Sequence, residues 1–304
     1  MNLERFDSRD DWLEARRRGV GASEAAVVLG ISPFATPLKL YLRKIGVDDF
    51  ESSPLMQWGT YLQPAIAQAY KDRTEKELID FEDTIIWSEK YPWLFASLDY
   101  GRAIDLSSSN DFDRVVEVKR VLYWAKDNWG DDGTDEIPTY YYSQVQQQLE
   151  CSGKQIADVA ALIGDCDFRI FTIERDDDYI EELAEAARLF MEQVANEDPP
   201  MPDFDHPTTL DLLNGQIEPN EASAIFLDDD ALELAVEYSK LSKLKSTTES
   251  RLRAIKSRLI FALGDASFAS LPRDSGSIKR TIVEKRGFYV EPSSYPKLTI
   301  KVED

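Results

Sequence analysis

The sequence contains very little histidine and cysteine. Its 304 residues include one histidine, His206, and two cysteines, Cys151 and Cys166. Two cysteines cannot build a disulfide framework, and they cannot supply a four-cysteine zinc or iron–sulfur site. The composition therefore argues against histidine-based and cysteine-cluster mechanisms.

Long apolar runs are also absent. No stretch reaches the length of about 18 apolar residues that a membrane span needs, and residues 1–7 lack the apolar segment of a signal peptide. Hydrophobic residues make up 43% of the chain and aromatic residues 11%, which indicates a folded globule. We therefore expect an intracellular protein without membrane association, with core enough for one large domain or two.

Positive charge is scarce and unevenly placed. The net charge is −22, but residues 240–304 hold 14 Lys and Arg against 7 Asp and Glu, which leaves −29 on residues 1–239. This asymmetry suggests a basic appendage on an acidic body. An acidic body can still bind nucleic acid if a basic lining is confined to one cleft, with strong dependence on salt.

The apolar pattern predicts an α/β fold in which helices flank a mixed central sheet. One helix is expected to begin near Ser8. Further helices are expected over residues 21–30, 36–45, 62–77, 139–151 and 178–196. Expected strands cover residues 84–87, 94–99, 115–118, 156–163 and 168–173.

Prolines divide the chain into three predicted parts: a core over residues 1–198, a linker over 199–227 and an arm over 228–304. The arm is expected to be a helix over 228–263 followed by a small antiparallel β module from 277–284 and 297–302. Apolar residues in the helix recur at intervals of three and four, which fits a heptad seam that Lys245 and Thr248 interrupt.

Two acidic segments 18 residues apart carry the first chemical signal, Asp99 in the one and Glu117-Val118-Lys119 in the other. Side chains alternate along a strand, so Glu117 and Lys119 point to one side of the sheet, and Asp99 reaches them if the two strands are neighbours. Two carboxylates and an ammonium would hold a divalent cation and orient a water against a phosphate. Hydrophobic-Glu-hydrophobic-Lys also arises by chance in many edge strands, so other motifs must decide.

Two further segments resemble parts of a binding site. The run from Arg16 to Ser23 places glycines, a serine and an arginine cluster at a helix start, which suits an anion, although a capped surface helix with a solvated basic patch has the same pattern. Tyr141, Gln144 and Gln148 share one helix face, as they would in any amphipathic helix. Gln63, at a helix entry, is expected to face the same cleft.

The order of these motifs resembles the lambda-type phage recombination exonucleases, the YqaJ-like branch of the restriction-enzyme-like PD-(D/E)XK nuclease fold. The segments 21–24, 30–34 and 171–176 resemble that family as well, and the resemblance covers roughly residues 10–196. Several motifs in the right order are far more specific than any one of them.

The resemblance implies a role for each matching residue. Asp99 and Glu117 correspond to the metal-binding carboxylates, the Val118 carbonyl to a further metal ligand, and Lys119 to the lysine that positions or activates the water. Tyr141 and Gln144 correspond to an active-site tyrosine and glutamine. The residues implied to hold the 5′-phosphate of a DNA end are Arg16 and Ser23, with Arg17 as an alternative to Arg16.

One position departs from the family. A glutamate that helps to hold a second metal is replaced by Gln63, and a neutral amide oxygen is a poorer Mg²⁺ ligand than a carboxylate. Three consequences of this replacement are open. The enzyme relies more on one metal, or a nearby acid such as Glu24 takes the place of the missing metal ligand, or the nuclease activity is low.

The sequence is thus interpreted as a Mg²⁺-dependent exonuclease of linear duplex DNA ends, with Mn²⁺ as a substitute, acting 5′ to 3′ in phage or prophage recombination in the cytoplasm of a bacterial host. The resemblance also implies a ring-like homo-oligomer and a single-strand annealing protein as partner. The rival interpretation is a non-catalytic or weakly active nuclease fold that binds DNA ends or a protein partner.

Overall fold

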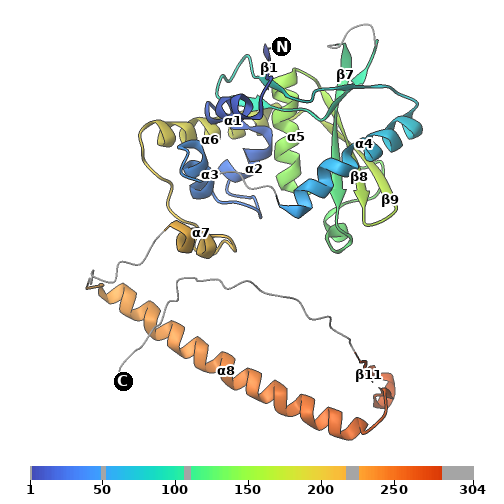
Figure 1. Ribbon diagram of the computed structural model, residues 1–304, viewed down its shortest axis with the longest axis vertical. Coiled ribbons are helices and arrows are strands. Elements are labelled where there is room, and N and C mark those ends of the chain that lie inside the picture. The colour runs from blue at the N-terminus through green and yellow to red at the C-terminus, as the bar shows by residue number, and fades with distance from the viewer. Residues whose placement is uncertain (1, 49–52, 106–110, 217–225, 283–304) are drawn as a thin grey trace. The chain divides into compact units, whose positions relative to one another are not determined.

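The computed structural model describes residues 2–48, 53–105, 111–216 and 226–282. The chain divides into two compact units, Met1–Leu213 and Asn214–Asp304. The first unit contains two sheets and most of the helices (Figure 1). The predicted mixed α/β architecture with a long C-terminal helix is confirmed.

The larger sheet has five strands in the order β3-β6-β7-β8-β9. Their bounds are β3 Leu78–Asp80, β6 Tyr100–Ala103, β7 Phe112–Val121, β8 Ile156–Ile163 and β9 Asp167–Glu174. Strands β7 and β8 are parallel and the other pairs are antiparallel, so the sheet is mixed. A parallel pair needs a crossover, and the chain supplies it with helix α5, Thr139–Ser152.

The two faces of this sheet are covered by different helices because the side chains of β7 alternate. Val116 and Val118 pack against helix α4, Pro54–Thr74, through Ile66 and Tyr70. Val115 belongs to the main core on the other face, which it shares with residues of α5 and of α6, Asp177–Ala195. Odd-numbered side chains of the strand therefore face the α5 side.

The smaller sheet has the order β1-β4-β5-β2, and its strands come before β7 in the sequence. Its strands are β1 Asn2–Arg5, β4 Thr84–Trp87, β5 Leu94–Ala96 and β2 Val20–Gly21. Helices α1 Arg9–Arg17, α2 Ala25–Val28 and α3 Pro37–Lys44 belong to the same part of the chain. The helix predicted over 21–30 is instead a 3₁₀ turn, Ala22–Glu24, followed by the single turn of α2.

The strand predicted over residues 94–99 was wrong at its end. It stops at Ala96 in the smaller sheet, and β6 begins at Tyr100 in the larger one. The segments that contain Asp99 and Glu117 are thus not one pair of long neighbouring strands. Asp99 lies in the connection between two sheets and reaches β7 because Tyr100 pairs with Val116.

Part of the predicted linker is ordered structure. Helix α7, Thr209–Gln216, falls inside residues 199–227, and both Thr209 and Leu212 are buried. His206 Nε2 lies 3.0 Å from the carbonyl oxygen of Ser32. Proline content predicted a break in regular structure, but it could not show that this segment packs back on the first unit.

The second unit contains helix α8, Asp229–Leu263, and the hairpin of β10 Phe268–Ser270 with β11 Ser277–Lys279. Asp228 caps the start of α8 by accepting a hydrogen bond from the backbone N–H of Ala231. The predicted strand over 277–284 is shorter, and its partner is β10. The predicted strand over 297–302 lies outside the described residues.

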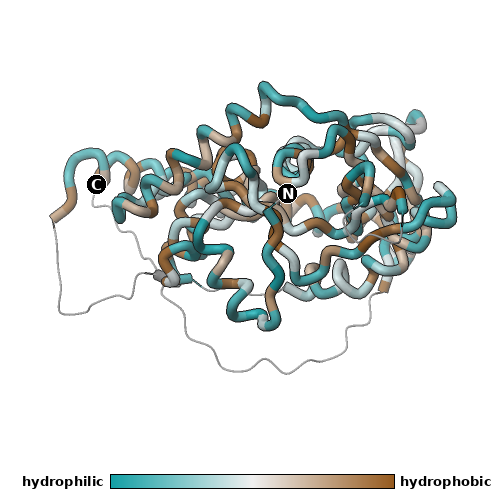
Figure 2. The backbone as a smooth tube through the Cα atoms, turned by 90° about the horizontal axis from the view of Figure 1, so that it is seen from above, coloured by the Kyte–Doolittle hydropathy of each residue, from teal (hydrophilic) through white to brown (hydrophobic). Residues whose placement is uncertain are grey.

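Among the residues that the structure describes, no helix is long and apolar enough to cross a membrane. Figure 2 shows the hydropathy of the residues along the chain: hydrophobic segments are short and alternate with hydrophilic ones.

Candidate active site

Glu117 is the centre of a polar cluster inside an otherwise apolar core. It is 3% exposed and projects from β7 toward α5. Its Oε1 accepts hydrogen bonds from Lys119 Nζ at 2.5 Å and from Gln144 Nε2 at 2.7 Å. Its Oε2 accepts one from Gln148 Nε2 at 2.6 Å. A buried carboxylate is stable only when it is paired in this way.

Helix α5 supplies the partners of Glu117 because residues four apart lie on the same face of a helix. Gln144 and Gln148 both reach the carboxylate, and Gln144 Oε1 also accepts a hydrogen bond from Lys119 Nζ at 3.1 Å. The Lys119 ammonium lies 4.7 Å from the centre of the Tyr141 ring. The structure therefore brings together four of the predicted site residues, Glu117, Lys119, Tyr141 and Gln144.

Asp99 completes this group from the connection before β6. Its Oδ2 accepts a hydrogen bond from the backbone N–H of Val118 at 2.8 Å. Burial and the neighbouring Glu117 carboxylate raise the pKa of Asp99 to about 8. For Lys119, burial acts to lower the pKa, but the attraction of Glu117 and other nearby groups outweighs it and the net shift is upward.

The donor set fits a hard divalent cation. Two carboxylates and the Val118 carbonyl are the oxygen ligands that Mg²⁺ prefers, and a carboxylate has about four lone-pair positions, so Asp99 and Glu117 retain acceptor capacity. Within the described part of the chain, the buried Oε1 of Gln148 beside Glu117 has no hydrogen-bond partner. Among the same described residues, no group of three or more His, Cys, Asp and Glu side chains is arranged to hold a metal ion.

Gln63 lies on the other side of the sheet, on α4. It hydrogen-bonds to Tyr100, whose pKa is raised chiefly by burial, and Tyr100 directly follows Asp99 in the chain. Within the described ranges, Asp99 is hydrogen-bonded to Val118, and Glu117 to Lys119, Gln144 and Gln148, but neither to Gln63. The structure thus places Gln63 near the rim of the group rather than inside it.

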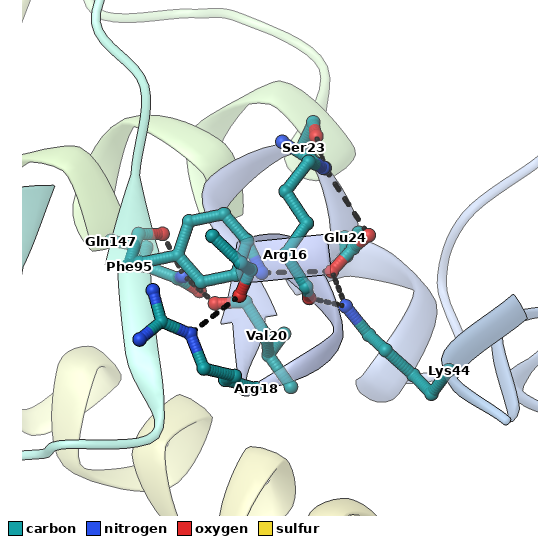
Figure 3. Close-up of polar contacts among 10 residues, drawn as sticks. Arg16, Arg18, Val20, Ser23, Glu24, Lys44, Phe95 and Gln147 are labelled. Atoms are coloured by element: carbon teal, nitrogen blue, oxygen red, sulfur yellow. Dashed lines mark hydrogen bonds and ion pairs between the residues drawn. The ribbon is translucent and has the colours of Figure 1, made fainter. Parts of the chain in front are cut away.

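A second polar cluster surrounds the start of α2 (Figure 3). Arg16 Nη2 lies 3.3 Å from Ser23 Oγ and 3.2 Å from Glu24 Oε1. The guanidinium of Arg16 also stacks over Trp12, 4.6 Å from the ring centre, and lies 5.2 Å from the centre of Phe95. Arg16 and Ser23 are therefore held side by side, as predicted for an anion site.

Arg17, the alternative to Arg16, points elsewhere. It bonds to Glu14 on its own helix, with the two charged groups 3.1 Å apart. Successive residues of a helix do not face one another, so only one of two adjacent arginines can reach Ser23.

Lys44 is a member of this second cluster that the motif reasoning missed. It is 7% exposed, and its Nζ donates to Glu24 Oε2 at 2.6 Å and to the Arg16 carbonyl at 2.7 Å (Figure 3). Burial lowers the pKa of Lys44 and Glu24 offsets only part of that shift. For Glu24, burial acts upward, but Lys44 and Arg16 bring its pKa below the usual range. With its charge committed to these two cations, Glu24 is not positioned as a substitute metal ligand.

Gln147 connects the two clusters through α5. Its Nε2 donates to the carbonyl oxygens of Val20 at 2.7 Å and of Phe95 at 2.8 Å, which belong to the neighbouring strands β2 and β5 of the smaller sheet. Its neighbours on the helix, Gln144 and Gln148, hold Glu117 in the larger sheet. A run of three glutamines inside a buried helix was the available sequence signal for this role, since buried amides need partners.

The mixed sheet, its flanking helices and the strand that carries Glu117 and Lys119 agree with the fold class expected from the sequence. Residues 11–155 match the family model described as YqaJ-like viral recombinase domain. The match spans both polar clusters.

The chain is also similar to individual proteins. It is 28% identical over 266 residues to the uncharacterized protein YqaJ of Bacillus subtilis, covering 86% of this chain and 80% of that protein. Among solved structures, an alkaline exonuclease from Laribacter hongkongensis is 22% identical over 62% of this chain and 94% of its own, with a TM-score of 0.49. A phage-related exonuclease from Haemophilus somnus is 13% identical over 59% and 96%, with a TM-score of 0.44. These scores are too low to carry an inference about function.

Proposed function

We propose that the protein is a metal-dependent exonuclease that hydrolyses phosphodiester bonds at the ends of linear duplex DNA. The observation that carries this proposal is that Asp99, Glu117 and Lys119 come together at β7, with Tyr141 and Gln144 beside Lys119. The viral recombinase family and its setting in DNA recombination support the same substrate.

Each residue has a defined task in this proposal. Asp99, Glu117 and the Val118 carbonyl would hold Mg²⁺ or Mn²⁺, which when bound would supply a water of lowered pKa and neutralise charge on the phosphate. Lys119, held by Glu117 and Gln144, orients the attacking water, and the Tyr141 ring screens the ammonium from solvent. Gln144 and Gln148 keep the Glu117 carboxylate in one orientation.

The proposed polarity, 5′ to 3′, rests on the second cluster. Arg16 and Ser23 can donate hydrogen bonds to a terminal 5′-phosphate, and Trp12 and Glu24 hold the guanidinium in place. Lys44 acts as a positioning residue because it contacts both Glu24 and the Arg16 backbone. A ring-like homo-oligomer and a single-strand annealing partner, acting in the cytoplasm of a bacterial host, remain expectations from the family resemblance.

A non-catalytic protein that binds DNA ends is the second candidate, and Gln63 favours it. An amide in place of a carboxylate weakens a second metal site, and an end-binding protein would need only the Arg16 cluster.

The test is incubation of linear 5′-phosphorylated duplex with the protein in Mg²⁺, in Mn²⁺ and in a chelator. We expect nucleotides to be released from the linear duplex only when the metal is present. Closed circular duplex should stay intact. Binding of the linear duplex without release in either metal would replace the exonuclease with the end-binding protein.

A further inference from the structure

A row of three aromatic rings leads from the candidate active site to the surface of the first unit. The centre of the Tyr141 ring lies 4.7 Å from the Lys119 ammonium. The ring centres of Tyr141 and Tyr140 are 4.5 Å apart, and those of Tyr140 and Phe34 are 5.4 Å apart. Phe34, at the outer end of the row, is 61% exposed. The row therefore ends in an aromatic side chain that the first unit leaves accessible to a ligand.

The loop that carries Phe34 is held firmly, although the ring itself is exposed. This loop follows α2 and precedes α3. The backbone N–H groups of Ile31 and Ser32 both donate to the carbonyl oxygen of Ala26 at 3.0 Å. Ser32 Oγ accepts a hydrogen bond from the backbone N–H of Phe34 at 3.1 Å. A ring on such a loop can bind a ligand without the entropy cost of ordering the loop.

His206, the single histidine, supports the same loop from the segment before α7. Its Nδ1 accepts a hydrogen bond from the backbone N–H of Thr208 at 3.2 Å, so Nε2 carries the proton of the neutral ring. Nε2 then donates to the carbonyl oxygen of Ser32 at 3.0 Å. Ser32 is 8% exposed, so the contact is shielded from water. The histidine therefore helps to present Phe34.

The contact with Tyr140 leaves the Phe34 ring free for stacking. The planes of the two rings are nearly perpendicular, at 88°. An edge-to-face contact of this kind occupies at most one face of each ring. At least one face of Phe34 is thus open, and such a face favours a flat π-system as its ligand.

The two polar clusters identify this π-system as a nucleobase. The Phe34 loop follows α2, whose start belongs to the Arg16 cluster, and the inner end of the aromatic row lies at Lys119. A nucleotide with one phosphate at each cluster carries its base into the region where the row lies. At the end of a duplex, the last base has one face that no neighbouring base covers.

We propose that Phe34 stacks on this uncovered face of the terminal base, with Tyr140 and Tyr141 holding its ring in line with the active site. The proposal rests on the proposed function, since its ligand is a DNA end, and it adds a contact to the base where the Arg16 cluster contacts phosphate. Such stacking tolerates any sequence, because every base has a π-face. It also distinguishes an end from the interior of a duplex, where both faces of each base are covered.

The test is a cycle between protein and substrate, read as affinity in a chelator so that no hydrolysis is needed. Two 5′-phosphorylated linear duplexes are compared, one with an ordinary 5′-terminal nucleotide and one with an abasic residue in its place. The native protein should bind the abasic end roughly tenfold more weakly, because the stacked base is lost. Phe34→Leu should bind both ends with this lower affinity, since the two changes remove the same contact.

Two controls separate the ring from other effects. Phe34→Tyr keeps an aromatic ring at the same position and should bind the ordinary end within roughly twofold of the native protein. An abasic residue about ten nucleotides inside the duplex lies away from the end and should change the affinity of the native protein and of Phe34→Leu by less than roughly twofold.

Three results would overturn the inference: equal binding of the two ends by the native protein, losses that multiply when Phe34→Leu meets the abasic end, or a loss in Phe34→Tyr as large as in Phe34→Leu. If the native protein binds both ends equally but still releases nucleotides with a metal, only this inference fails. A linear duplex that is neither bound nor degraded would overturn the proposed function as well.

Discussion

The two polar clusters of the first unit are opposite in charge. Around Glu117, two carboxyl groups meet one lysine, and burial together with the Glu117 carboxylate raises the pKa of Asp99. Around Arg16, two cations meet one carboxylate, so the group carries excess positive charge and the pKa of Glu24 is lowered. The first composition suits a cation and the second suits an anion.

The difference is bridged by one helix. Gln144 and Gln148 bind the negative cluster, and Gln147 binds the strands beside the positive one. In the proposed exonuclease, α5 would therefore connect the site for the cation with the site for the DNA end.

The largest expected effect is loss of the negative cluster's chemistry. Glu117→Gln and Lys119→Ala should each reduce degradation of linear duplex by roughly 10²–10⁴-fold, since a cation ligand or the group that orients the water is removed. Rates of nucleotide release check this, with circular dichroism to confirm folding. Lys71→Ala, which breaks only a surface ion pair with Glu77, is the matched control and should retain activity. Metal-dependent activity in both site variants would contradict the assignment.

The next effect separates the positive cluster from the negative one. Arg16→Ala should lower the preference for 5′-phosphorylated over 5′-hydroxyl ends by roughly 10- to 100-fold, because a charge-assisted hydrogen bond to phosphate is worth about 1.5–3 kcal/mol. Lys44→Met should reduce the same preference less. The neighbouring Arg17→Ala, which loses only its contact to Glu14, should leave the ratio unchanged. Equal ratios in the Arg16 and Arg17 variants would remove the proposed phosphate site.

The connection between the clusters can be broken at Gln147. In Gln147→Met the carbonyl oxygens of Val20 and Phe95 lose their donor, which should lower the free energy of unfolding by about 1–3 kcal/mol. Urea unfolding measures this loss, with the exposed Gln155→Met as control. No difference between the two variants would show that α5 does not hold the smaller sheet.

The smallest effect concerns Gln63 and sharpens the description of the negative cluster. If Gln63 reaches a second metal, Gln63→Glu should lower the Mg²⁺ concentration for half-maximal activity by roughly threefold, since an added carboxylate raises cation affinity. Gln68→Glu places the same charge on an exposed position of α4 and serves as the comparison. Identical Mg²⁺ curves for the two variants would place Gln63 outside the metal site.

Motif order in the sequence was sufficient to select Asp99, Glu117, Lys119, Tyr141 and Gln144, and the structure brings these residues together. The prediction that Asp99 lies in a strand was wrong, because residues 94–99 stay largely apolar through the point where the chain leaves one sheet for the other. Lys44 was missed because a lone lysine in an amphipathic helix ordinarily points to solvent, and only packing beneath Arg16 buries it.

The sequence by itself determined the local properties of this protein: the alternation that puts Glu117 and Lys119 on one face, the helix spacing of residues 144 and 148, and the excess of basic residues over 240–304. These follow from periodicities of two and 3.6 residues, which depend on neighbours in the chain. Only the tertiary structure decided which residues become partners across the fold, such as Gln147 with Val20 and Glu24 with Lys44. Contacts between residues far apart in the chain depend on how the sheets and helices pack, and no local pattern records that packing.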